Sequence, residues 1–211
     1  MIRPIYLFGP GAEVLSRPAR TLTWDRYERD AADVFAPQIL ASLLADLRET
    51  LYACAVARGV GLAAPQIGVD LRVSVIDLAA IRAAGHRVPK DVPALLELIN
   101  PVIVEREGKN REREGCLSFP QLSAFVSRPA RVRVQYLDRD GQPRELVGEQ
   151  ILARALAHEV SHLEGRLIVH ECGAFGRDVL LRQQRKLRAA IGGPAWLPGE
   201  AVQAPAAEPT P

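Results

Sequence analysis

The sequence predicts a single α+β domain in which mainly antiparallel strands surround a central helix, with further helices towards both ends of the chain. Two observations lead to this prediction. Segments with strand-like patterns gather in the middle of the chain, and segments with helically spaced apolar residues lie on either side of them. The chain has 211 residues, of which 48% are hydrophobic, so it is long enough to form one good core.

The first helix is expected at residues 37–57. Pro37 suits the first turn of a helix, and Gly59 lies just past the expected end. The apolar residues that recur at helical spacing are Leu40, Leu43, Leu44, Leu47 and Leu51.

Strands are expected in the middle of the chain, at residues 71–77, 96–105 and 131–137. In the last of these, apolar residues alternate with polar ones, as in a half-buried antiparallel strand. Asp140-Gly141 then predicts a turn before "PRELVGE".

Helical spacing returns at residues 149–164, with Gly165 as the expected C-cap, and again at 177–191. From residue 192 onward Pro, Ala and Gly dominate. We therefore expect one folded domain at residues 1–191 and a flexible tail at 192–211.

Composition bears on partners and location. A net charge of +2 gives no reason to expect direct nucleic-acid binding, and no stretch approaches the roughly 18 apolar residues of a membrane span. The start of the chain lacks the long apolar region of a signal peptide. Three widely spaced cysteines suit a reducing cytoplasm. None of these features predicts the oligomeric state.

The segment "HEVSHLEG" (158–165) places His158 and His162 one helical turn apart. Two imidazoles in this arrangement supply half of a tetrahedral metal site, and Glu159 is placed to act as a general base. HExxH also occurs by chance in helices whose histidines are solvated or pair with carboxylates. Here the preceding turns are apolar, which favours histidines that point into a core; the apolar residues are Ile151, Leu152, Ala155 and Leu156.

The third ligand is open on the residues alone. His170 and Cys172 follow on the run "RLIVHEC", which looks extended and is expected to lead away from the helix. Cys116, in "EGCLSFP", is the upstream candidate, since a thiolate is a good ligand for such metals. A lone cysteine is nevertheless more often a small buried apolar residue.

A third segment, "GVGLAAPQIG" (59–68), has two glycines that permit close backbone approach, followed by Gln66. No Lys-Ser/Thr pair follows, so it does not predict a phosphate-binding loop. On its own, this segment is equally consistent with a glycine-rich connection from the end of a helix to a buried strand.

Together, "GVGLAAPQ", "EGCLS" and HExxH resemble, in order and spacing, the three signature motifs of the peptide deformylases. The resemblance extends through "LINP" (98–101), "VSRPARV" (126–132) and the final helix, so it covers most of residues 1–190. It implies an α+β metallohydrolase that removes the formyl group from the N-terminal formyl-Met of nascent polypeptides and releases formate, in a bacterial-type cytoplasm. The substrate partner is then an N-formylated nascent peptide, met at the ribosome exit.

The same resemblance implies the site residues. One divalent metal, Fe(II) with Zn(II) or Ni(II) as alternatives, is bound by Cys116, His158 and His162, with a water in the fourth position. Glu159 is the general base, and the Gln66 amide and the Leu117 backbone N–H stabilise the oxyanion. The implied substrate-binding residues are Val60, Gly61, Gly115, Ser118, Arg128, Ile151, Arg154 and Ala155.

Four positions depart from the family pattern. Ser161 stands where an Asp is usual, Ala157 replaces a Gln, and Arg58 replaces an acidic residue. Arg154 lies one turn before His158, where an apolar side chain would line the pocket for Met. Either its charge reaches solvent along its stem, or the pocket prefers a substrate other than formyl-Met.

Three alternatives to a standard deformylase remain. The chain is a divergent paralogue with altered substrate preference, an HExxH metallopeptidase with another third ligand, or a non-catalytic homologue that only binds peptide or ribosome. A Cys116→Ala variant that kept metal and activity would favour the peptidase. Absence of deformylation with every metal would favour the non-catalytic homologue.

Overall fold

A five-stranded antiparallel sheet forms one layer of the computed structural model, which describes residues 1–24, 34–54 and 59–199. Its order is β10-β9-β6-β5-β4, and every neighbouring pair is antiparallel. The α+β prediction is confirmed, and the alternation expected at 131–137 is the burial pattern of β9. The strands are β4 (Gly61–Ala63), β5 (Val73–Asp77), β6 (Leu95–Glu107), β9 (Arg131–Leu137) and β10 (Pro143–Glu149).

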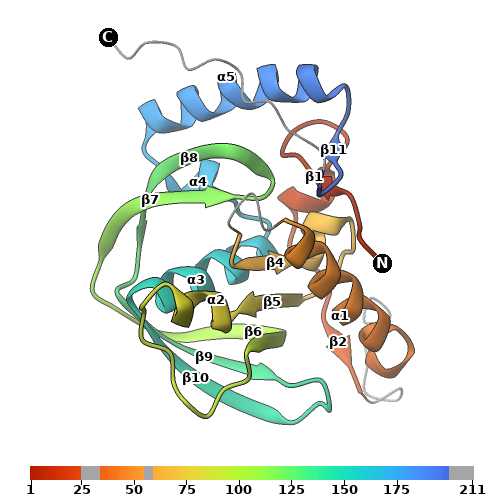
Figure 1. Cartoon of the computed structure of the whole chain (residues 1–211), viewed down its shortest axis with the longest axis vertical. Coiled ribbons are helices and arrows are strands. Elements are labelled where there is room, and N and C mark those ends of the chain that lie inside the picture. The colour runs from red at the N-terminus through yellow and green to blue at the C-terminus, as the bar shows by residue number, and fades with distance from the viewer. Residues whose placement is uncertain (25–33, 55–58, 200–211) are drawn as a thin grey trace.

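Helix α3 (Gln150–Leu163) lies across this sheet and carries the HExxH segment (Figure 1). Gln150 has a positive φ of 52°, so the chain turns sharply from β10 into the helix. Gly148 permits the close approach, because a Cβ there would lie 2.6 Å from Leu156 Cδ1. The buried face of α3, including Leu152, Leu156 and Val160, packs into one apolar cluster with the sheet.

A second pair of strands, β7 (Asn110–Cys116) and β8 (Phe119–Arg128), forms a hairpin that curves over the other side of α3 (Figure 1). Its register shifts between Gly115 and Cys116. The extra residues of this irregularity lie on β8, between Phe119 and Ser123, so β7 itself stays continuous. The HExxH segment of α3 lies between the hairpin and the sheet.

Two long helices lie outside these layers (Figure 1). Helix α1 (Ala36–Ala53) buries the five leucines expected to form its apolar face; residues 55–57 of the expected helix lie outside the described residues. Helix α5 (Ala174–Ile191) begins three residues before the expected 177 and packs against β8. The remaining elements are β1 (Ile5–Tyr6), η1 (Glu13–Ser16), β2 (Leu22–Thr23), β3 (Val34–Phe35), η3 (Ala64–Ile67), α2 (Leu78–Ala83), α4 (Ile168–Glu171) and β11 (Ala195–Trp196).

The run after Gly165 corrects one expectation. It is not extended, because Ile168–Glu171 forms the short helix α4. Ile168 and Val169 are buried in a cluster with β8 and α5, and the Leu167 N–H donates to His170 Nδ1 at 3.0 Å. Tertiary packing thus outweighs the strand preference of two adjacent β-branched residues.

The chain past residue 191 also packs with the domain. Strand β11 pairs antiparallel with β1, and Trp196 is only 5% exposed. Part of the segment expected to be a Pro/Ala-rich tail therefore contributes to the core, and residues 200–211 lie outside the described residues.

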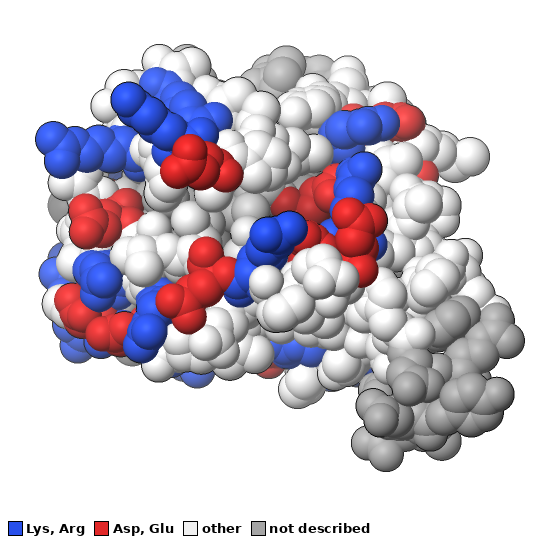
Figure 2. Space-filling view, turned by 90° about the horizontal axis from the view of Figure 1, so that it is seen from below, with Lys and Arg blue, Asp and Glu red and all other residues white. Residues whose placement is uncertain are grey.

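Acidic and basic side chains are interspersed on the face seen from below (Figure 2). On the sheet, cross-strand ion pairs join Arg131 to Glu107 at 2.6 Å and Arg133 to Glu105 at 2.7 Å. Within the described residues, every helix is too short or too polar to cross a bilayer.

Candidate metal centre

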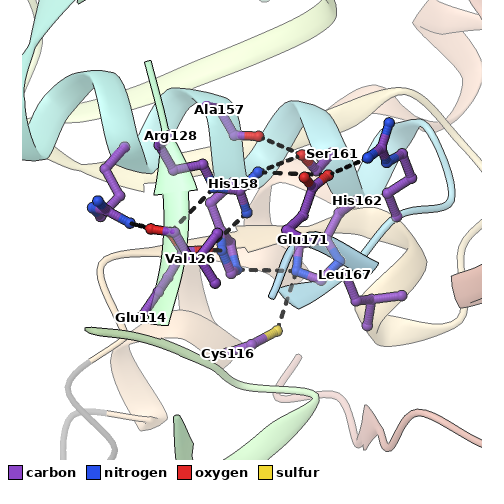
Figure 3. Close-up of polar contacts among 12 residues, drawn as sticks. Glu114, Cys116, Val126, Arg128, Ala157, His158, Ser161, His162, Leu167 and Glu171 are labelled. Atoms are coloured by element: carbon purple, nitrogen blue, oxygen red, sulfur yellow. Dashed lines mark hydrogen bonds and ion pairs between the residues drawn. The ribbon is translucent and has the colours of Figure 1, made fainter. Parts of the chain in front are cut away.

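Three side chains that could hold a metal ion meet between the β7–β8 hairpin and α3 (Figure 3). His158 and His162 lie one turn apart on α3, and their Nε2 atoms are 3.2 Å apart. Cys116 comes from the end of β7 and brings its Sγ to 3.3 Å from His162 Nε2. The ligand atoms of the three residues all lie within 4.8 Å of one another. His170 and Cys172 are not part of this group.

The chemistry of this donor set fits a divalent metal. A sulfur and two imidazole nitrogens face one another at hydrogen-bond distance, and one cation can hold all three together. Burial lowers the pKa of His162 well below its usual value, which keeps its imidazole neutral, as a ligand must be. Three protein ligands leave room for a reactant, as in catalytic rather than structural sites.

Glu114, which the sequence reading did not single out, orients the first of these histidines. Its Oε1 lies 2.7 Å from His158 Nδ1, so it fixes the ring with Nε2 towards the other ligands. Burial raises the pKa of this carboxyl, but His158 and Arg128 outweigh that effect and hold the pKa well below its usual range. Glu114 precedes Cys116 by two residues in β7, and strand alternation puts both side chains on one face.

Two arginines complete the surroundings of Glu114. Arg128 donates from Nη2 and Nε to the two carboxylate oxygens, at 2.7 and 3.2 Å. Arg154 Nη1 lies 2.9 Å from Oε2. All three side chains are buried, so one anion serves two buried cations and one imidazole.

Glu159 is buried beside the three side chains. It is 2% exposed, and burial raises the pKa of its carboxyl to about 7. A pKa near neutrality suits a group that takes a proton and then releases it. The carboxylate fits only because residue 61 is a glycine: a Cβ there would lie 2.3 Å from Glu159 Oε1.

Gln66, on η3, presents its amide N–H groups to the same centre. Its Oε1 accepts a hydrogen bond from the Ala63 N–H at 2.9 Å, which fixes the orientation of the amide. Its Nε2 then lies 3.3 Å from Ser118 Oγ and 3.7 Å from Cys116 Sγ. The three sequence segments that resembled signature motifs therefore meet at one place.

A pocket of about 430 Å³ opens beside these residues. It is lined by Leu117, His158 and Glu159 and by six of the eight residues expected to bind substrate: Val60, Gly61, Gly115, Ile151, Arg154 and Ala155. The other two lie elsewhere. Ser118 is fully buried against Gln66, and Arg128 lies behind the pocket, paired with Glu114. The Arg128 guanidinium is buried in contacts with protein and does not line this pocket.

The structure excludes the first of the two expectations for Arg154, a charge that reaches solvent; the substrate preference of the pocket stays a prediction. Its charge does not reach solvent, since the side chain is 6% exposed. Nor does the charge face the pocket unpaired: besides Glu114, the guanidinium binds the Asn110 carbonyl at 3.0 Å, the Val126 carbonyl at 3.3 Å and Glu112 at 3.5 Å. The aliphatic stem is therefore the part left to line the pocket.

Ser161 hydrogen-bonds to the residue that holds Glu114. Its hydroxyl accepts a hydrogen bond from Arg128 Nη1 at 2.9 Å and donates to the Ala157 carbonyl at 2.8 Å (Figure 3). A carboxylate is still near, because Glu171 Oε1 lies 3.9 Å from Arg128 Nη1. Arg58, another departure, lies outside the described residues.

Comparisons with known proteins agree on one family. A family model described as polypeptide deformylase matches residues 12–177. A peptide deformylase of Acidobacterium capsulatum is 38% identical over 190 residues, covering 90% of this chain and 98% of that protein. The crystal structure of a peptide deformylase from Legionella pneumophila superposes with a TM-score of 0.71 at 36% identity, covering 91% of this chain and 98% of that one. A Thermus thermophilus peptide deformylase gives 0.68 at 35%, covering 88% and 95%.

Proposed function

The chain belongs to the polypeptide deformylase family, and we propose that it removes the formyl group from the N-terminal formyl-Met of nascent polypeptides and releases formate. The observation that carries the proposal is the meeting of Cys116, His158 and His162 with the carboxylate of Glu159 at one pocket. A reaction on nascent chains takes place where translation does, so the proposal includes the cytoplasm and an encounter near the ribosome exit.

Cys116, His158 and His162 are the proposed metal ligands. A divalent metal held there would polarise the formyl carbonyl and lower the pKa of a water molecule. We propose Fe(II), with Zn(II) and Ni(II) as alternatives, because one thiolate and two imidazoles suit all three. Glu114 keeps Nε2 of His158 turned towards the metal position.

The remaining residues handle protons and charge. Glu159 accepts a proton from the attacking water and delivers it to the leaving amine, and its pKa of about 7 suits both steps. As negative charge develops on the formyl oxygen, the Gln66 amide and the Leu117 backbone N–H are the proposed donors. Each such donor is worth about 3 kcal/mol of barrier.

The pocket supports an apolar first side chain. Val60, Ile151, Ala155 and the stem of Arg154 line it, and the Arg154 charge is held by Glu114. Strand β4 is the outermost strand of the sheet at this edge, so an extended peptide could pair with the backbone near Gly61. This arrangement favours the formyl-Met substrate over a divergent specificity.

The proposal can be tested by incubating formyl-Met peptides anaerobically with the Fe(II)-loaded protein and analysing the products by mass spectrometry. A product that lacks only the formyl group is the expected result. Cleavage of an internal peptide bond would instead identify a metallopeptidase. An unchanged peptide that binds to the metal-loaded protein would identify a non-catalytic homologue.

A further inference from the structure

The backbone that follows Cys116 is held from behind by segments distant in the sequence. The Leu117 carbonyl accepts a hydrogen bond from the indole Nε1 of Trp196 at 3.0 Å. The next carbonyl, of Ser118, accepts from Gln184 Nε2 at 3.0 Å and from the Phe8 N–H at 3.3 Å. A buried carbonyl needs such donors, so these bonds fix the orientation of both peptide groups.

Trp196 can hold the Leu117 carbonyl in one position because strand pairing fixes its own backbone. It pairs with Ile5 in the β1–β11 ladder, and the Leu7 N–H donates to the Pro194 carbonyl at 2.7 Å. The indole is 5% exposed and shares an apolar cluster with Leu117. The anchor therefore combines strand pairing, burial and a directed hydrogen bond.

Leu117 has little freedom on its other side. A Cβ at Gly59 would lie 2.9 Å from Leu117 Cδ1, so the leucine already packs closely against that backbone. Leu117 also lines the pocket next to Cys116. The residue is thus held between the C-terminal strand and the site where the reaction is proposed to occur.

We propose that Trp196 is a positioning residue: its indole N–H holds the Leu117 carbonyl and thereby aims the Leu117 backbone N–H at the formyl oxygen. This rests on the proposed deformylation. The two peptide groups that flank the Leu117 Cα are linked by only two torsion angles, so orienting the carbonyl restricts the direction of the N–H. The short C-terminal strand is then part of the catalytic scaffold.

The sharpest test removes the indole N–H and keeps the ring, by placing 3-benzothienylalanine at position 196. Complete loss of an oxyanion donor costs about 10²–10³-fold in kcat, so a displaced donor is expected to cost about tenfold. KM and metal content should stay at the wild-type values. Amide hydrogen exchange of the peptide that spans residues 115–119 should become about tenfold faster, because a fixing bond is gone.

Trp24, the other of the two tryptophans, provides the matched control. It lies away from the site, beside a separate concavity lined by Pro37 and Leu40. The same replacement there should leave kcat and exchange at 115–119 unchanged.

Wild-type kcat in the 196 variant would overturn the proposal, and so would loss of metal in step with rate, which indicates a merely structural role. Wild-type protein that releases no formate would instead refute the proposed function. Exchange at 115–119 would then decide the positioning role, with wild-type protection in the 196 variant counting against it.

Discussion

The carboxylate of Glu114 holds the guanidinium of Arg154 at 2.9 Å, in a buried ion pair one turn of α3 away from His158. Because of this pair, the Arg154 charge is held by the protein and is not presented to a substrate. A charge that the sequence places beside the pocket is paired with an acid 40 positions away in the chain.

Replacing Arg154 should therefore affect stability more than specificity. Arg154→Leu leaves Glu114 with His158 and Arg128 as partners, so we expect the free energy of unfolding to fall by about 1–3 kcal/mol. The preference for formyl-Met over peptides with an acidic first residue should change by less than about tenfold, which is less than one methylene group is worth in an apolar pocket.

Chemical denaturation measures the change in stability, and kcat/KM on the two kinds of peptide measures the change in preference. Arg113→Leu, at an exposed residue that also lines the pocket, is the control. A larger rise in formyl-Met preference without lost stability would show that the charge acts on substrate.

The HExxH helix and its apolar face could be predicted from the sequence because their spacing is local. His158, Glu159 and His162 need only one helical turn to come together. On the residues alone Cys116 was only a candidate, and its resemblance to a known motif selected it, because its approach to α3 depends on how the β7–β8 hairpin folds. Glu114 had a local signal in strand alternation, but β7 itself was not predicted.

Other contacts could not be predicted because they join distant segments. Trp196 meets Leu117 across 79 positions, and a Pro-rich composition around it indicated a tail. The run at 168–171 carries two β-branched residues, and only packing against β8 and α5 selects a helical turn.

Gly61 should prove indispensable to the rate but not to metal binding. In Gly61→Ala the new Cβ would lie 2.3 Å from Glu159 Oε1, so the carboxylate must move. A displacement of about 1 Å at a reacting group can cost about 10²-fold in rate, and we expect at least that loss in kcat with unchanged metal content. Gly176→Ala, where the new Cβ meets only Cys172 at 3.8 Å, is the control. Normal turnover by Gly61→Ala would exclude Glu159 as the base.

The ligand assignment separates the three cysteines. Cys116→Ala, His158→Ala and His162→Ala should each lose most of the bound metal, because each removes one of three donors. Cys54→Ala and Cys172→Ala should retain it, since neither thiol belongs to the group of ligand atoms formed by Cys116, His158 and His162. Metal content of the purified variants, measured by mass spectrometry, gives the answer. Equal loss of metal from Cys172→Ala would contradict the assignment.

Ser161→Asp should strengthen the network behind the ligands. An aspartate in place of the hydroxyl would face the buried Arg128 guanidinium with a full charge. The present hydrogen bond already has one charged partner, Arg128, and an aspartate would turn it into an ion pair, so we expect the free energy of unfolding to rise by about 1 kcal/mol. Ser161→Asn, of matched size and without charge, controls for packing. Equal stability of the two variants, by denaturant titration, would show that the charge at this position is irrelevant.

The central claim is that this chain releases formate through a metal held by Cys116, His158 and His162, with Glu159 moving the proton. The most direct test of this claim is to measure formate release from a formyl-Met peptide under anaerobic conditions. The Fe(II)-loaded wild-type protein and Glu159→Gln are compared at equal metal content. We predict multiple turnovers for the wild type and a loss of about 10²–10⁴-fold for the variant, the range that general-base catalysis supplies. Formate release by Glu159→Gln at the wild-type rate, or none from metal-loaded wild type, would contradict the claim.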